Sequence, residues 1–314
     1  MDPKNMIKHR MTNSLHTLML ILSTVGIMTL TGWILGGPVG VKIALVFALA
    51  GLIFSPSWSS MAVMKMNRAV PLSPAAAPRL HHITRLLSER AGLKKVPVLY
   101  YTPASKPNAF AAGSRKDPAI CVSQGLIRIL NIHELAGIIG HEITHIKNKD
   151  VQVMRLTGIL GRVTFYLSLC GQIGLIFVLP LIWTGRVEIP LLPVILLAIA
   201  PSVSMLMQMA LSRRREYEAD LGSARLVGSP DHLISALSKL DFFQKQMLHW
   251  YRLPLAAPGQ NDLLNTHPPT QKRIARLRSL RQGKPGAAAF RRSHPLLSAN
   301  RGFRRSQLPG YFFN

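Results

Sequence analysis

Four stretches of the chain are almost continuously apolar and about as long as a helix needs to cross a lipid bilayer. They cover residues 15–35, 41–58, 163–185 and 190–211. The hydrocarbon core of a bilayer is roughly 30 Å thick, which takes about 20 helical residues. The last two stretches contain prolines and glutamines, so helices buried inside the protein are the alternative there. The pattern predicts about four transmembrane helices, arranged as two pairs.

Between and after these pairs the apolar residues follow shorter periods. Residues 74–92 predict an amphipathic helix. Three short strands bounded by Pro and Gly follow at residues 96–102, 108–112 and 119–123. A helix of about five turns comes next, because Asn131 and Glu134 are typical of a capping box ahead of an apolar stripe. We therefore expect an α+β protein that is mainly helical and contains a small β-sheet.

Charge adds an orientation to this picture. The net charge is +25, although 48% of the residues are hydrophobic. This combination fits apolar spans separated by basic segments. Basic residues precede the first span and follow the second and the fourth, whereas the loop at residues 36–41 is uncharged. The positive-inside rule then places both termini and the segment between the two pairs in the cytoplasm. The first apolar region is too long for a cleaved signal peptide and lacks an A-x-A site.

The helix that begins at Asn131 carries the most informative motif of the chain, His141-Glu142-Ile143-Thr144-His145. Positions i and i+4 share one face of a helix, so both imidazoles can reach one metal ion. Glu142 lies beside them and is suited to act as a general base on water. Two incidental histidines are the alternative. The spacing favours a hydrolytic zinc site with one Zn²⁺ per chain and a third ligand from elsewhere.

Glu216 is our candidate for the third ligand. It lies four residues before Asp220, so both share a face of a predicted helix, while Glu218 points away. We expect Asp220 to orient a ligating His through its other ring nitrogen. The alternative is an acidic helix face that pairs with the preceding arginines. Only 13 acidic residues occur in the whole chain, so three within five positions favour the metal site.

Taken together, these motifs resemble the integral-membrane zinc endopeptidases that include HtpX and the CAAX prenyl proteases. Further matching patches are Pro107–Gly113, Asn148–Asp150, and Thr266–Pro269 with Arg273–Ile274. The resemblance covers most of residues 8–280. It implies a zincin-like catalytic domain in which the sheet precedes the metal helix.

The resemblance also implies sites for the substrate. Asn108, Ala109 and Phe110 would belong to an edge strand that accepts an extended peptide by strand addition; an ordinary exposed edge is the alternative. His267 and Arg273 would approach the scissile carbonyl and stabilise the oxyanion. Alternatively, His267 caps the helix that carries Arg273.

The last 31 residues are basic and have no counterpart in the resemblance. No Asp or Glu occurs after residue 262, and aromatic residues interleave with the arginines. We expect this tail to bind anionic lipid at the membrane surface, at about 1 kcal/mol per basic residue. Nucleic acid is not expected as a partner, because no nucleic-acid-binding fold is evident. A disordered tail without a partner is the other alternative.

These observations predict five segments. They are an N-terminal membrane anchor at residues 1–58, the first catalytic part at 59–152, a membrane hairpin at 153–211, the second catalytic part at 212–283 and the basic tail at 284–314.

The function that the resemblance implies is a multi-pass zinc endopeptidase of the inner cell membrane, with its active site and both termini in the cytoplasm. Its substrates would be polypeptides, in particular misfolded or damaged membrane proteins. The alternatives are a processing protease for prenylated proteins and a catalytically silent zinc-binding scaffold. Glu142 argues against the scaffold, because a structural zinc site needs no general base.

Overall fold

The computed structural model describes residues 3–53, 59–185, 191–250 and 269–282. The chain divides into two compact units. Residues 1–55 and 153–212 form one, here called the helical unit, and residues 56–152 and 213–314 form the other, here called the mixed unit. The basic tail and the segment around His267 lie outside the described residues.

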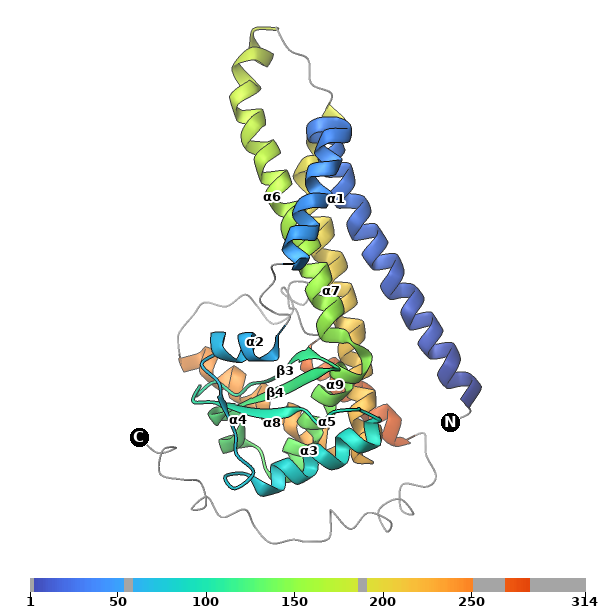
Figure 1. The fold of residues 1–314 in the computed structure, drawn as a ribbon, viewed down its shortest axis with the longest axis vertical. Helices are drawn as coiled ribbons and strands as arrows, with labels where there is room; N and C mark the ends of the chain where they lie inside the picture. Colours follow the sequence, from blue (N-terminus) through green and yellow to red (C-terminus); the bar gives the residue numbers. More distant parts are fainter. Residues whose placement is uncertain (1–2, 54–58, 186–190, 251–268, 283–314) are drawn as a thin grey trace. The chain divides into compact units, whose positions relative to one another are not determined.

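The helical unit contains a helix that turns back on itself. Helix α1 (Pro3–Ile53) is interrupted at Gly36 and Gly37, and Gly37 has a φ of +52° that favours glycine. The two halves of α1 then lie side by side (Figure 1). Gly32 and Gly40 allow this close approach, because a Cβ on Gly40 would overlap the carbonyl oxygen of Gly32.

The other two long helices are α6 (Asp150–Trp183) and α7 (Leu191–Val227), each with residues in both units. In the helical unit they are joined by polar contacts. The Ser168 hydroxyl donates to the carbonyl of Leu197, and Gln172 donates to the Ser168 hydroxyl at 3.0 Å. Such hydrogen bonds hold helices together in lipid, where apolar contact alone gives little preference.

In the part of the chain that the structure describes, three helical stretches are long and apolar enough to cross a membrane: Ile21–Ala50, Asp150–Phe177 and Leu192–Val227. The four predicted spans thus fall into three helices. The first two are joined in α1 because the chain stays helical on both sides of the glycine kink. The end of the second predicted span, residues 54–58, lies outside the described residues.

The mixed unit is built on a four-stranded sheet. Its strands are β1 (Val70–Pro71), β2 (Val98–Thr102), β3 (Ala109–Ser114) and β4 (Asp117–Ser123). Their order is β1-β2-β4-β3, with β2 and β4 parallel and the other pairs antiparallel. The three predicted strands are confirmed, whereas β1 was missed because two residues are too short to show a period.

Each face of this sheet is covered by helices. Ala112, Ala119 and Cys121 pack with Met64 of α2 (Ser60–Met66), while their neighbours Ile120 and Val122 pack into the core on the other face. That core holds α3 (Pro78–Ala91) and α5 (Ile132–Asn148) (Figure 1). The two-residue alternation of small and branched apolar side chains thus places α5 directly on the sheet.

Helix α5 begins and ends at clear signals. The side chain of Asn131 accepts hydrogen bonds from the backbone of His133 and Glu134, and Glu134 bonds back to the Asn131 backbone, which confirms the capping box. The helix ends at Lys149, whose φ is +62°, and α6 starts at the next residue.

Helices α4 (Gln124–Ile129), α8 (Asp231–Trp250) and α9 (Thr270–Gln282) complete the described part of the mixed unit. Helix α8 packs closely on α5, because a Cβ on Gly137 would lie 2.9 Å from the backbone nitrogen of Leu233. Glu134 joins the two helices, since it accepts hydrogen bonds from Ser235 at 2.6 Å and from Lys239 at 2.8 Å.

We predict that Glu134→Ala lowers the free energy of unfolding of the mixed unit by about 1–3 kcal/mol, because it removes a helix cap and the hydrogen bonds of a buried carboxylate with Ser235 and the half-exposed Lys239. Burial would raise the pKa of Glu134, but its hydrogen bonds with Lys239, Ser235 and Asn131 outweigh burial and hold the pKa below its usual value. The stabilisation is therefore present above about pH 4.3 and is lost as the pH falls further. Thermal unfolding in detergent at several pH values measures it. Glu89→Ala on α3, which removes an exposed carboxylate, is the control and should change little.

Candidate metal centre

The predicted ligands His141 and His145 lie on one face of α5, opposite the isoleucines that anchor the helix in the core. Their Nε2 atoms are 3.1 Å apart. The apolar stripe of α5 includes Ile139 and Ile143, which are fully buried. The packing of this stripe therefore fixes the rotation of the helix and directs both imidazoles to the same point.

Glu216 of α7 completes the group. Its carboxylate oxygens lie 3.5 Å from His141 Nε2 and 3.7 Å from His145 Nε2. One ligand atom from each of the three residues falls within 4.8 Å of the others. Zinc binds nitrogen and oxygen at about 2.0–2.2 Å in a tetrahedron, so its ligand atoms lie roughly 3.3 Å apart. The two imidazoles and the carboxylate fit zinc in both donor type and spacing.

Helix α7 can deliver Glu216 because it approaches α5 at glycines. A Cβ on Gly222 would overlap the side chain of Thr144, and a Cβ on Gly140 would lie 3.0 Å from the Ser223 hydroxyl. Ser223 in turn donates to the carbonyl of Gly137 at 2.6 Å. The small residues at this crossing bring the ligands of α5 and α7 within reach of one another.

Behind His141 lies the first of two pairs of a carboxylate and an arginine. His141 Nδ1 is 3.0 Å from an oxygen of Asp220. Arg273 of α9 donates to both oxygens of Asp220, from Nε at 2.8 Å and from Nη2 at 2.6 Å, and its Nη1 lies 3.3 Å from Glu216. Asp220 thus occupies the position expected of a residue that orients a ligating His.

These contacts shift the pKa values of His141 and Arg273. Burial by itself lowers the pKa of the His141 imidazole, but its contacts with Asp220 and Glu216 outweigh burial and raise the pKa to about 10. Burial also lowers the pKa of the Arg273 guanidinium, and Asp220 and Glu216 more than compensate and raise it. Arg273 therefore stays charged beside the ligands.

Behind His145 lies a second pair that sequence reasoning did not identify. His145 Nδ1 is 2.8 Å from Asp150 Oδ2, and Arg215 donates to Asp150 Oδ1. On a continuous helix, a residue five positions after His145 would lie about 140° away from it. Asp150 can return to His145 only because α5 ends at Lys149. The Asn148-Lys149-Asp150 motif was the available signal, but helical periodicity gave it no role.

The candidate base Glu142 is buried on α5 next to His141. Its negative charge is one of those that raise the pKa of Arg273, which places it near the ligands. Of the predicted substrate residues, Arg273 lies beside the metal ligands, and three others lie at β3 of the sheet on which α5 packs. Ala109 and Phe110 belong to β3, which occupies one edge of the sheet, and Asn108 precedes it with its backbone nitrogen 2.8 Å from the Ser123 hydroxyl. His267 lies outside the described residues.

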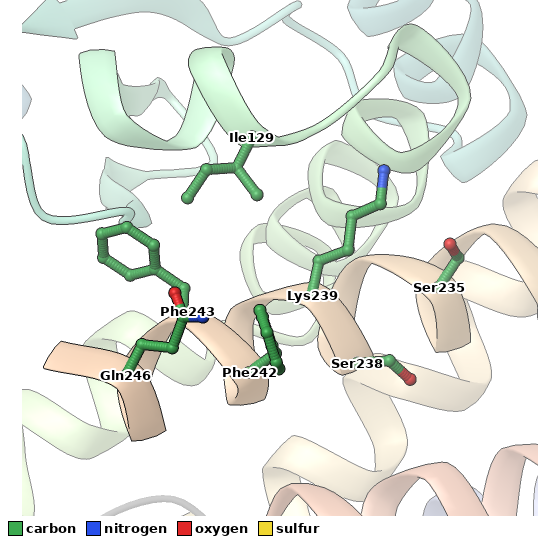
Figure 2. Close-up of a pocket in the computed structure, with 7 residues that line it drawn as sticks. All are labelled: Ile129, Ser235, Ser238, Lys239, Phe242, Phe243 and Gln246. Atoms are coloured by element: carbon green, nitrogen blue, oxygen red, sulfur yellow. The ribbon is translucent and has the colours of Figure 1, made fainter. Parts of the chain in front are cut away.

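A groove of about 380 Å³ lies between α4 and α8 and is separate from these residues. Figure 2 shows its lining, with Ile129 on α4 and the remaining side chains on α8. Two of its polar residues, Ser235 and Lys239, are engaged with Glu134. They therefore have a structural explanation in the packing of α8 on α5.

Comparison with known proteins gives consistent matches. The sequence profile described as Peptidase family M48 matches residues 74–281. The chain is 33% identical over 295 residues to the "Protease HtpX homolog" of Desulfatibacillum aliphaticivorans, covering 88% of this chain and 93% of that protein. It is 36% identical over 288 residues to the "Protease HtpX homolog" of Syntrophobacter fumaroxidans, covering 86% and 100%.

Among solved structures, the crystal structure of S. mikatae Ste24p is similar with a TM-score of 0.49 and 18% sequence identity. The match covers 88% of this chain and spans 66% of the length of that one.

We predict that Glu216→Gln strips the metal and that Glu218→Gln does not, because residues two apart on a helix lie about 200° apart around its axis. The two variants remove the same charge from the same turn of α7, so each is the control for the other. Zinc content under a competing chelator is the measurement. Loss of zinc from Glu218→Gln alone would show that the third ligand is assigned to the wrong residue.

Proposed function

The chain belongs to peptidase family M48, and we propose that it is an endopeptidase that cleaves misfolded or damaged membrane proteins at the cytoplasmic face of the membrane. As a member of this family it is a zinc metallopeptidase whose metal site is formed by His141, His145 and Glu216. The observation that carries the proposal is the convergence of these three ligands beside a buried carboxylate, Glu142, that is not among the grouped ligand residues.

The catalytic step is assigned to Glu142. Zinc, when bound, supplies a Lewis acid that polarises the peptide carbonyl and makes a water more acidic. Glu142 takes the proton from the attacking water and later delivers a proton to the departing amine. A catalytic base is needed for hydrolysis and has no use in a site that holds zinc only for structure.

Strand β3 is the proposed binding edge for the substrate. Among the described strands, β3 pairs only with β4, so its other edge offers backbone groups to an extended peptide. Main-chain hydrogen bonds carry little sequence information, which suits an enzyme that removes damaged proteins of many sequences. Asn108, Ala109 and Phe110 are the residues proposed to receive the chain.

Arg273 is proposed to stabilise charge on the carbonyl oxygen, together with His267. A guanidinium has five N–H donors, and three of its nitrogen–oxygen contacts go to Asp220 and Glu216. These contacts support the proposal because they fix the guanidinium beside the metal ligands. The other N–H groups of its two Nη atoms are the ones proposed to donate to the carbonyl oxygen.

The membrane orientation is also part of the proposal. The chain is a multi-pass membrane protein with three candidate spans among its described residues. Basic residues flank the ends of the spans that lead into the mixed unit, which favours a cytoplasmic mixed unit in the inner cell membrane. The basic tail at residues 284–314 is proposed to bind anionic lipid on that side.

We predict that Glu142→Gln reduces casein cleavage by the detergent-purified chain by at least about a thousandfold while one zinc per chain remains. Glutamine keeps the size of the side chain but cannot accept the proton. Metal analysis and cleavage are measured on the same sample. Glu218→Gln, an equal loss of charge on α7, is the matched control and should cleave casein at the wild-type rate. Residual activity of Glu142→Gln near the wild-type level would contradict the assigned base.

The orientation predicts the sides on which reporters appear. A reporter fused after Gly37 should lie outside the cytoplasm, whereas reporters at Ala77 and after Gln282 should lie inside. A paired alkaline phosphatase and fluorescent-protein fusion at each position gives the answer in cells. An external reporter at Ala77 would overturn the proposed compartment without affecting the metal site.

A further inference from the structure

Both histidines of the metal centre contact a carboxylate through Nδ1, and both carboxylates are held by an arginine. His141 has Asp220 and Arg273, and His145 has Asp150 and Arg215. The second group comes from the junction of three helices: α5 supplies the histidine, α6 the aspartate and α7 the arginine.

Both oxygens of Asp150 have a partner. Oδ2 lies 2.8 Å from His145 Nδ1, while Oδ1 accepts from Arg215. Asp150 is only 3% exposed and Arg215 only 8%. In such a site water does not compete for the carboxylate, and its charge is balanced by the guanidinium. The imidazole ring of His145 is thereby held in one orientation.

The backbone around Asp150 is built to bring it back to His145. Lys149 ends α5 in the left-handed conformation, and Asp150 then occupies the first turn of α6, where a negative charge is favourable. Arg115 of the β3–β4 turn donates to the carbonyl of Lys147 and so fastens the end of α5. The break between α5 and α6 at Lys149 is therefore fixed by a contact before it, at Lys147, and by the contacts of Asp150 after it.

We propose that Asp150 is a positioning residue for the metal ligand His145, and that Arg215 holds Asp150 in place. By accepting the Nδ1 proton, Asp150 selects the tautomer of His145 whose Nε2 lone pair faces the metal, and it makes that nitrogen a better donor. Arg215 directly precedes the ligand Glu216. One turn of α7 thus supplies both the third ligand and the support for the second.

This inference rests on the proposed metal site, and its test measures metal affinity. The full chain is purified in detergent, and its zinc dissociation constant is measured by competition with a chromogenic chelator. We expect Asp150→Ala to weaken zinc binding about 10–100-fold. Asp150→Asn should weaken it less, because the amide oxygen still accepts the Nδ1 proton. The visible absorption of the Co²⁺-substituted chain should change in both variants, since it reports the ligand field at the metal.

The matched control is Asp117→Asn. Asp117 also accepts two hydrogen bonds, from the backbone and hydroxyl of Ser60, but it joins α2 to the sheet and does not contact the ligands. It should lower the temperature of unfolding at most and leave the zinc dissociation constant and the Co²⁺ spectrum unchanged. A variant that only loosens the fold is thereby distinguished from one that misplaces His145.

Arg215 is tested through its coupling to Asp150. Arg215→Gln should weaken zinc binding, and Arg215→Lys should recover part of the loss because it restores the charge beside Asp150. In an Asp150→Ala background, Arg215→Gln should cause little further loss, since it acts through Asp150. Additive losses would show that Arg215 acts independently, which contradicts the second half of the proposal.

The outcomes distinguish a failure of the positioning role of Asp150 from a failure of the proposed metal site. If the wild-type chain binds no zinc, the proposed metal site fails. If the wild type binds zinc and Asp150→Ala or Asp150→Asn binds it within twofold of the wild type with an unchanged Co²⁺ spectrum, the positioning role fails alone. Should Asp150→Ala not fold, the nearly isosteric Asp150→Asn decides by the same two measurements.

Discussion

The balance of buried charge around the metal centre is the constraint on which the rest of the mixed unit depends. Four carboxylates and two guanidinium groups are buried there: those of Glu142, Asp150, Glu216 and Asp220, and those of Arg215 and Arg273. With both histidines neutral, these groups leave an excess of two negative charges. A buried charge without a partner is strongly unfavourable. A divalent cation held by His141, His145 and Glu216 restores neutrality.

This balance explains why the site is assembled from so many elements. Helix α5 supplies two ligands and the proposed base, but it can supply no counter-charge on the same face without displacing them. The arginines therefore come from α7 and α9, and the carboxylates behind the histidines from α6 and α7. The crossing of α5 with α7 needs close packing, which Gly140 and Gly222 provide, and Gly137 allows the close approach of α8 to the other side of α5. The glycines that allow the helices to pack closely thus also bring the metal ligands of α5 and α7 together.

The parts of the site that sequence reasoning reached are those governed by regular helical geometry. His141 and His145 are four apart, as are Glu216 and Asp220, and the structure brings each pair to the same centre. Asp150 and Arg215 were missed because their roles depend on the end of α5 and on a contact between distant segments. The same reason applies to the spans, since apolar length predicted them but only the kink at Gly36 and Gly37 shows that two share one helix.

Helix α7 carries both a candidate membrane span and the third ligand of the metal. Its 37 residues make a helix about 55 Å long, well beyond the roughly 30 Å of a bilayer core. The uncharged residues 191–211 are enough for a span, and Glu216 follows five residues later on the same helix. The third ligand is therefore carried by the same helix as a candidate membrane span, and Asp150 begins another helix of this kind. Within the mixed unit, Arg215 of α7 donates to Asp150 of α6, so one contact joins the residue before the third ligand to the proposed support of His145.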